Sequence, residues 1–322
     1  MESGGNAMIT RRTVLRSLAA GAALTLSPSN VVLQAAPLTP PAPLIPSKAL
    51  TLTEALDHDA WACWIGHATV LIRMAGKWIL TDPVLFDAYG IHVLGLTLGP
   101  RRYTPPALSI DEIPRPDLIL LSHAHLDHMD RRTLIELSER YPGQIDVITA
   151  TNTRDVIEDL EWRSLNEMDW GDHVAIDGLE ITALQVEHNG WRMPGEACRA
   201  SGQRRTGRSY NGYLLESSHT SIVFGGDTAY TTQFGNIKRD VELAIMPIGA
   251  YRDCHAVHCN PEEAHAMVTM MKARRMLPIH HGTFNQQCEP AHEPIQRLLT
   301  AVTKDRRAML AGIRTGQPIA LA

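Results

Sequence analysis

Polar residues crowd the end of one apolar run, and this feature constrains the fold more than any other part of the sequence. The run DLILLS, residues 117–122, leads directly into His123, His125, Asp127 and His128. A short leucine-rich run bounded by polar residues predicts a buried β-strand. Histidines and carboxylates gathered at a strand end are costly to bury unless they pair or bind a metal ion. The stretch therefore predicts a metal site.

Three more predicted strands end in a histidine or an aspartate. These ends carry His188 after residues 179–187, Asp227 after residues 220–226, and His280 and His281 after residues 275–279. Ligands bind at the C-terminal ends of strands in α/β sheets, so we expect the four ends to meet. Neutral imidazoles and carboxylates suit zinc, with manganese or iron as alternatives. Seven such ligands are too many for one tetrahedral ion and fit two.

The order of the predicted elements indicates a mixed α/β sandwich with outer helices. Short runs rich in leucine and β-branched residues predict strands at 69–74, 77–81, 117–122, 179–187, 211–217, 220–226, 242–248 and 275–279. Helices are expected at 130–141, 151–163 and 260–275. The last has the clearest start, with Asn260 as N-cap and Pro261 after it. Residues 69–83 and 213–228 both read as strand, turn, strand and aspartate, which predicts two similar sheets packed face to face.

The N-terminal region differs from the rest of the chain. TRRTVLR, residues 10–16, precedes SLAAGAALTL and resembles a twin-arginine export signal. We therefore expect a signal peptide over 1–36, a Pro-rich linker over 37–49 and one hydrolase domain over 50–322. The apolar run of about ten residues is too short to span a bilayer comfortably, so no transmembrane anchor is expected in the mature chain. The twin-arginine machinery would deliver the protein to the periplasm.

Composition excludes some classes of function. A formal net charge of −5 gives no bulk electrostatic reason to bind nucleic acid. The five cysteines, an odd number, show none of the usual CxxC zinc spacings. We expect free or buried thiols, with a Cys254–Cys259 disulfide as the alternative.

The motif set resembles the metallo-β-lactamase superfamily over nearly all of residues 60–295. The resemblance implies an αββα sandwich with a dinuclear site between the sheets. Carried over by position, it implies a first metal held by His123, His125 and His188, and a second held by Asp127, His128 and His280, with Asp227 bridging the two. His280 is preferred over His281 because relatives carry tryptophan at the second position. The residues alone leave that choice open.

Finer features look like the N-acylphosphatidylethanolamine-hydrolysing phospholipase D subfamily, and ascorbate-6-phosphate lactonase relatives share some of them. The matching segments are WIGHATVLI (64–72), LTDPVL (80–85), LGPRRYTPP (98–106), MPIGAY (246–251), HCNPEEA (258–264) and IHHGTFNQQCEP (279–290). The resemblance implies a catalytic role for His258 beside the metals. The sequence departs from the pattern after His188, where Asn189-Gly190-Trp191 replaces an aromatic pair, and before His258. Both departures put a long-chain phospholipid substrate in doubt.

Two clustered metals indicate a hydrolase in which an activated water attacks phosphorus or a carbonyl. The leading hypothesis is a zinc-dependent phosphodiesterase acting on a small-molecule or lipid-derived substrate, with Asp127 and His258 as candidate catalytic residues. Asp82 is expected to orient a metal-bound histidine, and His67 either does the same or caps the first hairpin. Arg204, Arg205 and Arg208 either bind a phosphate or form a solvated loop. A lactonase is the nearest alternative, and a non-hydrolytic metal-binding or redox protein is another. A redox di-iron protein is disfavoured because such proteins usually carry glutamate where His125 stands.

Overall fold

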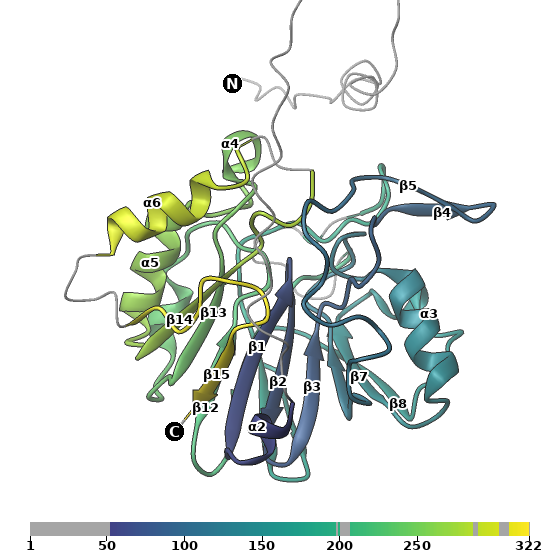
Figure 1. Ribbon diagram of the computed structural model, residues 1–322, viewed down its shortest axis with the longest axis horizontal. Coiled ribbons are helices and arrows are strands. Elements are labelled where there is room, and N and C mark those ends of the chain that lie inside the picture. The colour runs from purple at the N-terminus through teal and green to yellow at the C-terminus, as the bar shows by residue number, and fades with distance from the viewer. Residues whose placement is uncertain (1–51, 198, 200–206, 286–288, 303–308, 322) are drawn as a thin grey trace, which may run out of the picture. The chain divides into compact units, whose positions relative to one another are not determined.

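The first of the two packed sheets contains seven strands. The computed structural model describes residues 52–197, 199, 207–285, 289–302 and 309–321 (Figure 1). The sheet has the order β15-β1-β2-β3-β6-β7-β8. Its strands are β1 (Ala60–Gly66), β2 (Thr69–Met74), β3 (Lys77–Thr81), β6 (Leu118–Leu120), β7 (Asp146–Ala150), β8 (Ser164–Met168) and β15 (Pro318–Leu321). The run β3-β6-β7-β8 is parallel, so these strands end at one edge of the sheet.

The second sheet contains six strands in the order β14-β13-β12-β11-β10-β9. They are β9 (His173–Ile176), β10 (Leu179–Leu184), β11 (Gly212–Glu216), β12 (Ser221–Phe224), β13 (Leu243–Pro247) and β14 (Arg275–Ile279). The hairpins β2–β3 and β11–β12 lie in different sheets, which confirms the predicted repeat. Strands β12, β13 and β14 run parallel and bring their C-terminal ends together.

Three apolar layers hold the domain together. The layer between the sheets includes Trp64, Ile72, Phe224 and Ile245, all almost fully buried. Outer layers cover the far face of each sheet, with α3 on the first and α5 and α6 on the second (Figure 1). Such burial is the main stabilising contribution to the fold. The predicted αββα sandwich is confirmed.

The described helices are short, and only some of them begin at a side-chain cap. They are α2 (Thr53–Leu56), α3 (Arg131–Arg140), α4 (Tyr251–Cys254), α5 (Pro261–Met270) and α6 (Glu293–Ala301), with 3₁₀ turns η2 (Arg154–Val156) and η3 (Gln233–Asn236). Asp130 caps α3, and Asn260 forms a capping box with Glu263 at α5. None of the described helices is long and apolar enough to cross a membrane.

The predicted helix over residues 151–163 is wrong. Only η2 forms there, because tertiary contacts take the carbonyl groups that a helix would use. Arg131 donates to the Val156 carbonyl at 2.5 Å, and the Trp162 indole donates to the Ile157 carbonyl at 3.0 Å. The chain therefore passes across α3 as a turn rather than a helix.

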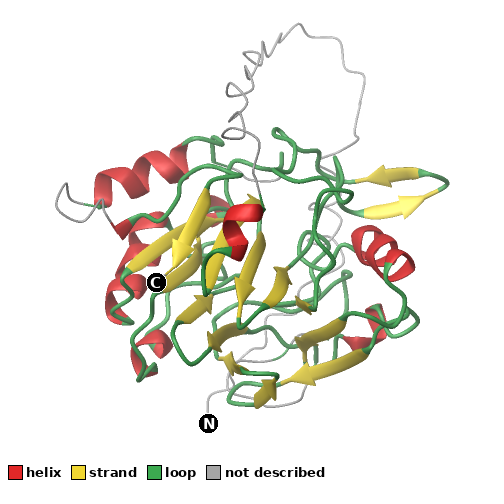
Figure 2. Cartoon of the chain, turned by 60° about the horizontal axis from the view of Figure 1, so that its bottom comes forward, coloured by secondary structure: helices red, strands yellow, loops and turns green. Residues whose placement is uncertain are grey.

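A two-stranded hairpin lies outside both sheets. It consists of β4 (Ile91–Val93) and β5 (Leu96–Leu98), which pair only with each other among the described strands. Figures 1 and 2 show it projecting away from the sandwich, on the side of α3. The sequence analysis did not predict this hairpin.

Three of the five cysteines lie within the described residues. Cys63 and Cys259 are free thiols, so no disulfide joins Cys254 to Cys259. Burial raises the pKa of the Cys63 thiol to about 12. The other two, Cys198 and Cys288, lie outside the described residues, as do the predicted signal peptide and linker.

Candidate metal centre

The strand ends of both sheets bring histidines and aspartates to one place. Among the described residues, four overlapping groups have ligand atoms that lie within 4.8 Å of one another. The groups are His67, Asp127, His128 and His280; His123, His125 and His188; Asp82, His123 and His128; and His188, Asp227 and His258. All seven sequence-predicted ligands fall in this cluster, which we call the metal centre.

One group consists of three histidines, each of which has one ring nitrogen hydrogen-bonded on the side away from the centre. His125 Nε2 lies 2.8 Å from Asn189 Oδ1, and His188 Nδ1 donates to the Val257 carbonyl at 2.8 Å. The opposite nitrogens, His125 Nδ1 and His188 Nε2, lie only 3.3 Å apart. His123 Nδ1 contacts Ser122 Oγ at 2.9 Å. Each outer contact therefore turns the remaining nitrogen inward, as in metal-ligating histidines.

Asp82 orients His128 from the far side of the ring. Its Oδ2 lies 2.7 Å from His128 Nδ1, and its Oδ1 accepts the Ser122 backbone N–H at 2.7 Å. Asp82 is fully buried directly after β3, and burial raises the pKa of its carboxyl. The structure thus places Asp82 where the sequence analysis expected it, behind a candidate ligand.

Asp227 and Asp127 are the central carboxylates. Asp227 Oδ2 lies 3.0 Å from His128 Nε2, 3.2 Å from His280 Nε2 and 3.8 Å from His188 Nε2. Asp127 Oδ2 lies 3.7 Å from His128 Nε2 and 3.6 Å from His280 Nε2. Asp227 thus reaches ligands of both predicted ions, which is the geometry expected of a bridging residue.

A glycine allows Asp227 to approach the other sheet. Gly226 has φ +58°, and a Cβ there would lie 2.8 Å from both the Asn211 carbonyl oxygen and Ser122 Cβ. A larger residue at position 226 would push the Asp227 segment away from Ser122, the residue that precedes His123.

The electrostatics of the centre favour cations. Burial raises the pKa values of Asp127 and Asp227, but neighbouring histidines outweigh it and hold both well below the usual range. Burial lowers the pKa of His280, but Asp227 and then Asp127 outweigh it and raise that pKa to about 9. Two ionised carboxylates therefore attract positive charge into the centre, as protons or as a divalent cation.

The two adjacent histidines at the end of β14 have different environments. His280 has φ +59° and joins Asp127 and Asp227 in the centre. His281 is equally buried but packs against Trp64, with ring centroids 4.8 Å apart. His281 belongs to none of the described ligand groups. The geometry therefore favours His280 as the ligand.

His67 contacts a candidate ligand directly. Its Nε2 lies 3.0 Å from Asp127 Oδ2, and its ring is fully buried 4.1 Å from the His280 ring centroid. Burial and then His280 lower the pKa of His67 to about 3, so the ring is neutral at pH 7. Of the two roles considered for His67, orientation of a ligand fits these contacts.

His258 lies at the rim of the centre, where the chain enters α5. Its Nδ1 is 3.8 Å from Asp227 Oδ2, and its ring centroid is 5.0 Å from that of His188. Burial lowers the pKa of His258 to about 4. The imidazole is therefore neutral at pH 7 and able to accept a proton.

The basic loop contributes less than the sequence indicated. Arg204 and Arg205 lie outside the described residues. Arg208 is engaged by Asp155, at 2.6 and 2.9 Å, and by Glu196 at 2.7 Å. These carboxylates occupy the guanidinium group, so the contacts do not support phosphate binding by Arg208.

Three supporting residues were missed from the sequence. Arg192 donates to the Ala124 and Met129 carbonyls at 2.8 and 2.9 Å and thereby braces the loop that carries the ligands. Ser122 and Asn189 hold His123 and His125. Asn189 was noted only as a departure from a family pattern. Nothing in its local sequence reveals a contact with a residue 64 positions away.

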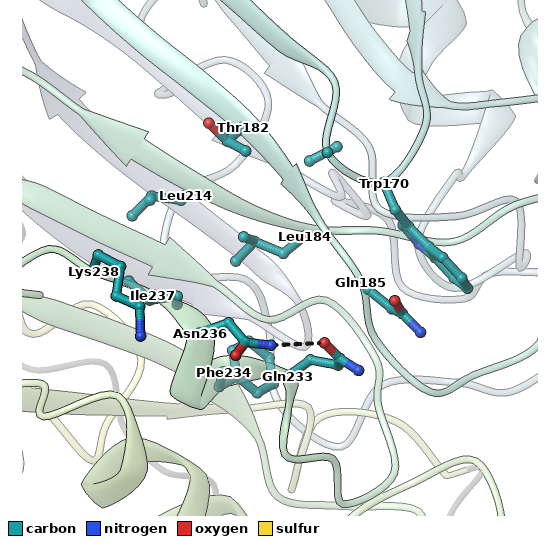
Figure 3. A pocket seen from close by; sticks show the side chains of 12 residues that line it. Trp170, Thr182, Leu184, Gln185, Leu214, Gln233, Phe234, Asn236, Ile237 and Lys238 are labelled. Atoms are coloured by element: carbon teal, nitrogen blue, oxygen red, sulfur yellow. Dashed lines mark hydrogen bonds between the residues drawn. The ribbon is translucent and has the colours of Figure 1, made fainter. Parts of the chain in front are cut away.

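Two cavities differ in the side chains that line them. A cavity of about 500 Å³ is lined by Leu126 and Asp130, which flank the ligand loop, and by Arg131, Arg132 and Arg192. A second cavity, of about 390 Å³, lies on the second sheet and is lined mainly by apolar side chains such as Trp170 and Phe234 (Figure 3). No lining residue of either cavity belongs to the metal centre, but Leu126 in the first directly precedes Asp127.

A family model described as a β-lactamase superfamily domain matches residues 77–281. The chain belongs to the metallo-β-lactamase superfamily. The described residues include His/Asp clusters that could bind metal.

Curated relatives resemble much of the chain. A Mycobacterium tuberculosis protein is 31% identical over 249 residues, which cover 74% of this chain and 63% of that protein. The N-acyl-phosphatidylethanolamine-hydrolyzing phospholipase D 1 of Caenorhabditis elegans is 28% identical over 244 residues, covering 71% and 65%. The chain thus spans less than two thirds of either relative.

A solved structure shows the same fold. The isothiocyanate hydrolase from Delia radicum gut bacteria superposes with a TM-score of 0.61 at 17% identity. The superposition covers 81% of this chain and 98% of that one.

Proposed function

We propose that the protein is a dinuclear zinc-dependent hydrolase of phosphodiester bonds. The observation that carries the proposal is the overlap of the ligand groups at Asp227, whose Oδ2 lies within 3.0 to 3.8 Å of His128, His280 and His188. Imidazole nitrogens and carboxylate oxygens are ligands that zinc accepts. Among the described residues, His123 Nε2 and Asp227 Oδ1 are buried without a hydrogen-bond partner, as expected of atoms that bind an ion.

The residues divide between two ions as the family resemblance implies. His123, His125 and His188 would hold one, and Asp127, His128 and His280 the other, with Asp227 between them. When bound, a zinc pair lowers the pKa of a water and stabilises negative charge that develops on the substrate.

The chain itself supplies positioning and proton transfer. Asp127 is fixed by His67 at 3.0 Å and stays ionised beside the reacting water. His258 is neutral at pH 7, and its Nδ1 is buried without a hydrogen-bond partner among the described residues. This nitrogen is placed to accept the proton of the attacking water and return it to the leaving alkoxide.

Basic side chains beside the centre favour a phosphodiester. Arg132 and Arg192 line the cavity that reaches Leu126, one residue before Asp127, whereas Arg131 in the same cavity is paired with Asp159. Guanidinium groups suit phosphate oxygens through forked hydrogen bonds. The Caenorhabditis elegans relative is also named for the hydrolysis of a phosphodiester lipid.

The reaction is tested with bis-p-nitrophenyl phosphate beside a panel of lactones. We expect turnover of the diester that a chelator abolishes and added zinc restores. Activity on lactones alone would contradict the phosphodiesterase assignment and favour a lactonase of the same metal centre.

The role of His258 is tested by His258→Ala. We expect turnover to fall by about 10²- to 10⁴-fold, the usual contribution of a positioned acid or base, while the metal content stays unchanged. Metal analysis and turnover are measured on the same preparation. Loss of metal together with activity would make His258 a ligand instead, consistent with its place beside His188 and Asp227.

We also propose, from the sequence, that residues 1–36 direct export to the periplasm through the twin-arginine machinery. The support is the TRRTVLR motif before a short apolar run. Arg11→Lys/Arg12→Lys should retain the protein in the cytoplasm, and fractionation of expressing cells checks this. Unchanged export would contradict the proposal.

A further inference from the structure

The β4–β5 hairpin exposes aliphatic side chains. Five of its eight residues are exposed leucine, isoleucine or valine: Ile91, Val93, Leu94, Leu96 and Leu98. Leu94 at the tip is 96% exposed and Leu96 is 68% exposed. The hairpin projects from the sandwich, and no described helix or strand covers it (Figures 1 and 2). A contiguous exposed patch of this kind marks an interaction site more often than scattered leucines do.

The register of the hairpin gathers its apolar side chains on one face. Ile91 pairs with Leu98, and Val93 pairs with Leu96, so these four side chains share a face. The opposite face carries His92 and Thr97, joined by a hydrogen bond of 3.1 Å. The hairpin is therefore amphipathic, although neither of its faces enters a described apolar layer.

The turn carries a leucine where a leucine is unfavourable. Leu94 has φ +50° and Gly95 has φ +79°, both left-handed. Hairpin turns with two such residues favour Asn-Gly, and a leucine there is strained. Since Leu94 is almost fully exposed, no buried contact within the domain offsets the strain. An outlier of this kind points to a role for the exposed tip.

Arginines lie around the hairpin, together with the carboxylates of exposed Asp87 at its base and of Asp130 and Glu136 in the neighbouring cavity. Residues 88–110 contain no aspartate or glutamate but include Arg101 and Arg102. Arg101 is exposed at the base of the hairpin, and exposed Arg132 lines the cavity beside Ile91. An apolar tip with exposed arginines at its base suits an element that lies in the interface of an anionic bilayer.

The hairpin also adjoins the metal centre. Gly90, Ile91 and His92 line the same cavity of about 500 Å³ as Leu126. Leu126 directly precedes Asp127, so a surface bound by the hairpin lies beside the loop that carries this ligand.

We propose that the β4–β5 hairpin docks the protein on anionic lipid bilayers, with Leu94 and the Ile91/Val93/Leu96/Leu98 face in the interface and Arg101 and Arg132 at the headgroups. A second copy of the chain is a poorer occupant. Eight residues are too few to supply the ~800 Å² that each partner gives to a standard protein interface. A bilayer needs no matching surface. The proposal is independent of the reaction that the centre catalyses.

Vesicle co-sedimentation of the full chain tests the proposal. The vesicles contain phosphatidylglycerol mixed with phosphatidylcholine, or phosphatidylcholine alone. The test variant is Leu94→Asn/Leu96→Thr, because asparagine suits the left-handed turn and threonine suits a strand. The matched control is Leu56→Asn, which changes another leucine, 58% exposed in α2.

We expect the wild type to bind the anionic vesicles, and the test variant to bind at least about tenfold more weakly because two leucines that would insert into the bilayer are lost. Leu56→Asn should bind like the wild type. Binding that persists in the test variant would overturn the proposal, since the docking element would then lie elsewhere. The proposal would also be overturned if both variants lost binding equally or if the wild type did not bind. It would be overturned as well if the wild type formed a dimer without lipid and the test variant were monomeric. Vesicle binding is measured without turnover, so failure of diester hydrolysis leaves the result intact.

Discussion

The directions of four imidazoles in the metal centre, those of His123, His125, His128 and His188, are set by hydrogen bonds on the side away from the centre. Asp82, Ser122, Asn189 and the Val257 carbonyl each engage one nitrogen of a candidate ligand. The ligands themselves could be predicted because each directly follows an apolar strand. Their outer partners could not, except Asp82, which also ends a strand. Partners such as Val257 are backbone groups, which leave no mark in the sequence.

Removing an outer contact should weaken metal binding without removing a ligand. Asp82→Asn takes the negative charge from behind His128 and should lower zinc affinity about 10- to 100-fold. Competition with a zinc-responsive chelator measures the affinity. Asp159→Asn, at an exposed carboxylate paired with Arg131, serves as the control. Equal affinities for wild type and Asp82→Asn would contradict the assigned role.

Glu196 links stability to acid pH through the loop after His188. Hydrogen bonds from Arg208 are the largest of the effects that lower the pKa of Glu196 to about 2, below its ordinary 4.5. Because the pKa is lower in the folded state, the stabilisation is present above pH 4.5. It is lost as pH falls through about 2. Solvent screening keeps the loss to about 1 kcal/mol or less.

The prediction for Glu196→Gln follows from this linkage. The variant should be slightly less stable than wild type at pH 7, and the difference should shrink as pH falls from 5 toward 2. Urea titrations across that range measure it, with Glu139→Gln at an exposed position of α3 as the control. A difference that stays constant with pH would contradict the assignment.

At the scale of elements, the sequence predicted those helices and strands that carry a local signal. The repeated hairpins and the α5 start are confirmed because alternating apolar runs and a capping box are local patterns. Strand β8, SLNEM, was missed because it is mostly polar and only partly buried. The β4–β5 hairpin was missed because its turn, Leu94-Gly95, lacks the usual asparagine or aspartate. Both depend on tertiary surroundings more than on composition.

The capping box at α5 gives a prediction at this scale. Asn260→Ala removes the acceptor of the Glu263 N–H and should cost about 1 kcal/mol of unfolding free energy. Urea unfolding measures the change. Thr269→Ala, at an exposed position in the same helix, should change stability little. An Asn260→Ala variant with the same unfolding free energy as the wild type would show that tertiary packing alone fixes the helix start.

At the scale of the described domain, the metal centre exists because two sheets meet at one edge. The first sheet supplies Asp82 and the residues from His123 to His128, and the second supplies Asp227 and His280. The sheets are tied near that edge by Tyr213, whose hydroxyl donates to the Leu121 carbonyl at 2.8 Å. The strand-end pattern could predict that the ligands lie together, because the C-terminal ends of the strands share one edge of the sandwich. The substrate could not be predicted, since the surrounding loops decide it.

Metal stoichiometry of freshly purified, unchelated protein tests the central claim most directly. Elemental analysis by mass spectrometry should give about two zinc, manganese or iron equivalents per chain. Asp227→Ala should reduce that number, because Asp227 lies between ligands of both ions. Protein that contains no bound metal when prepared without chelators would contradict the account.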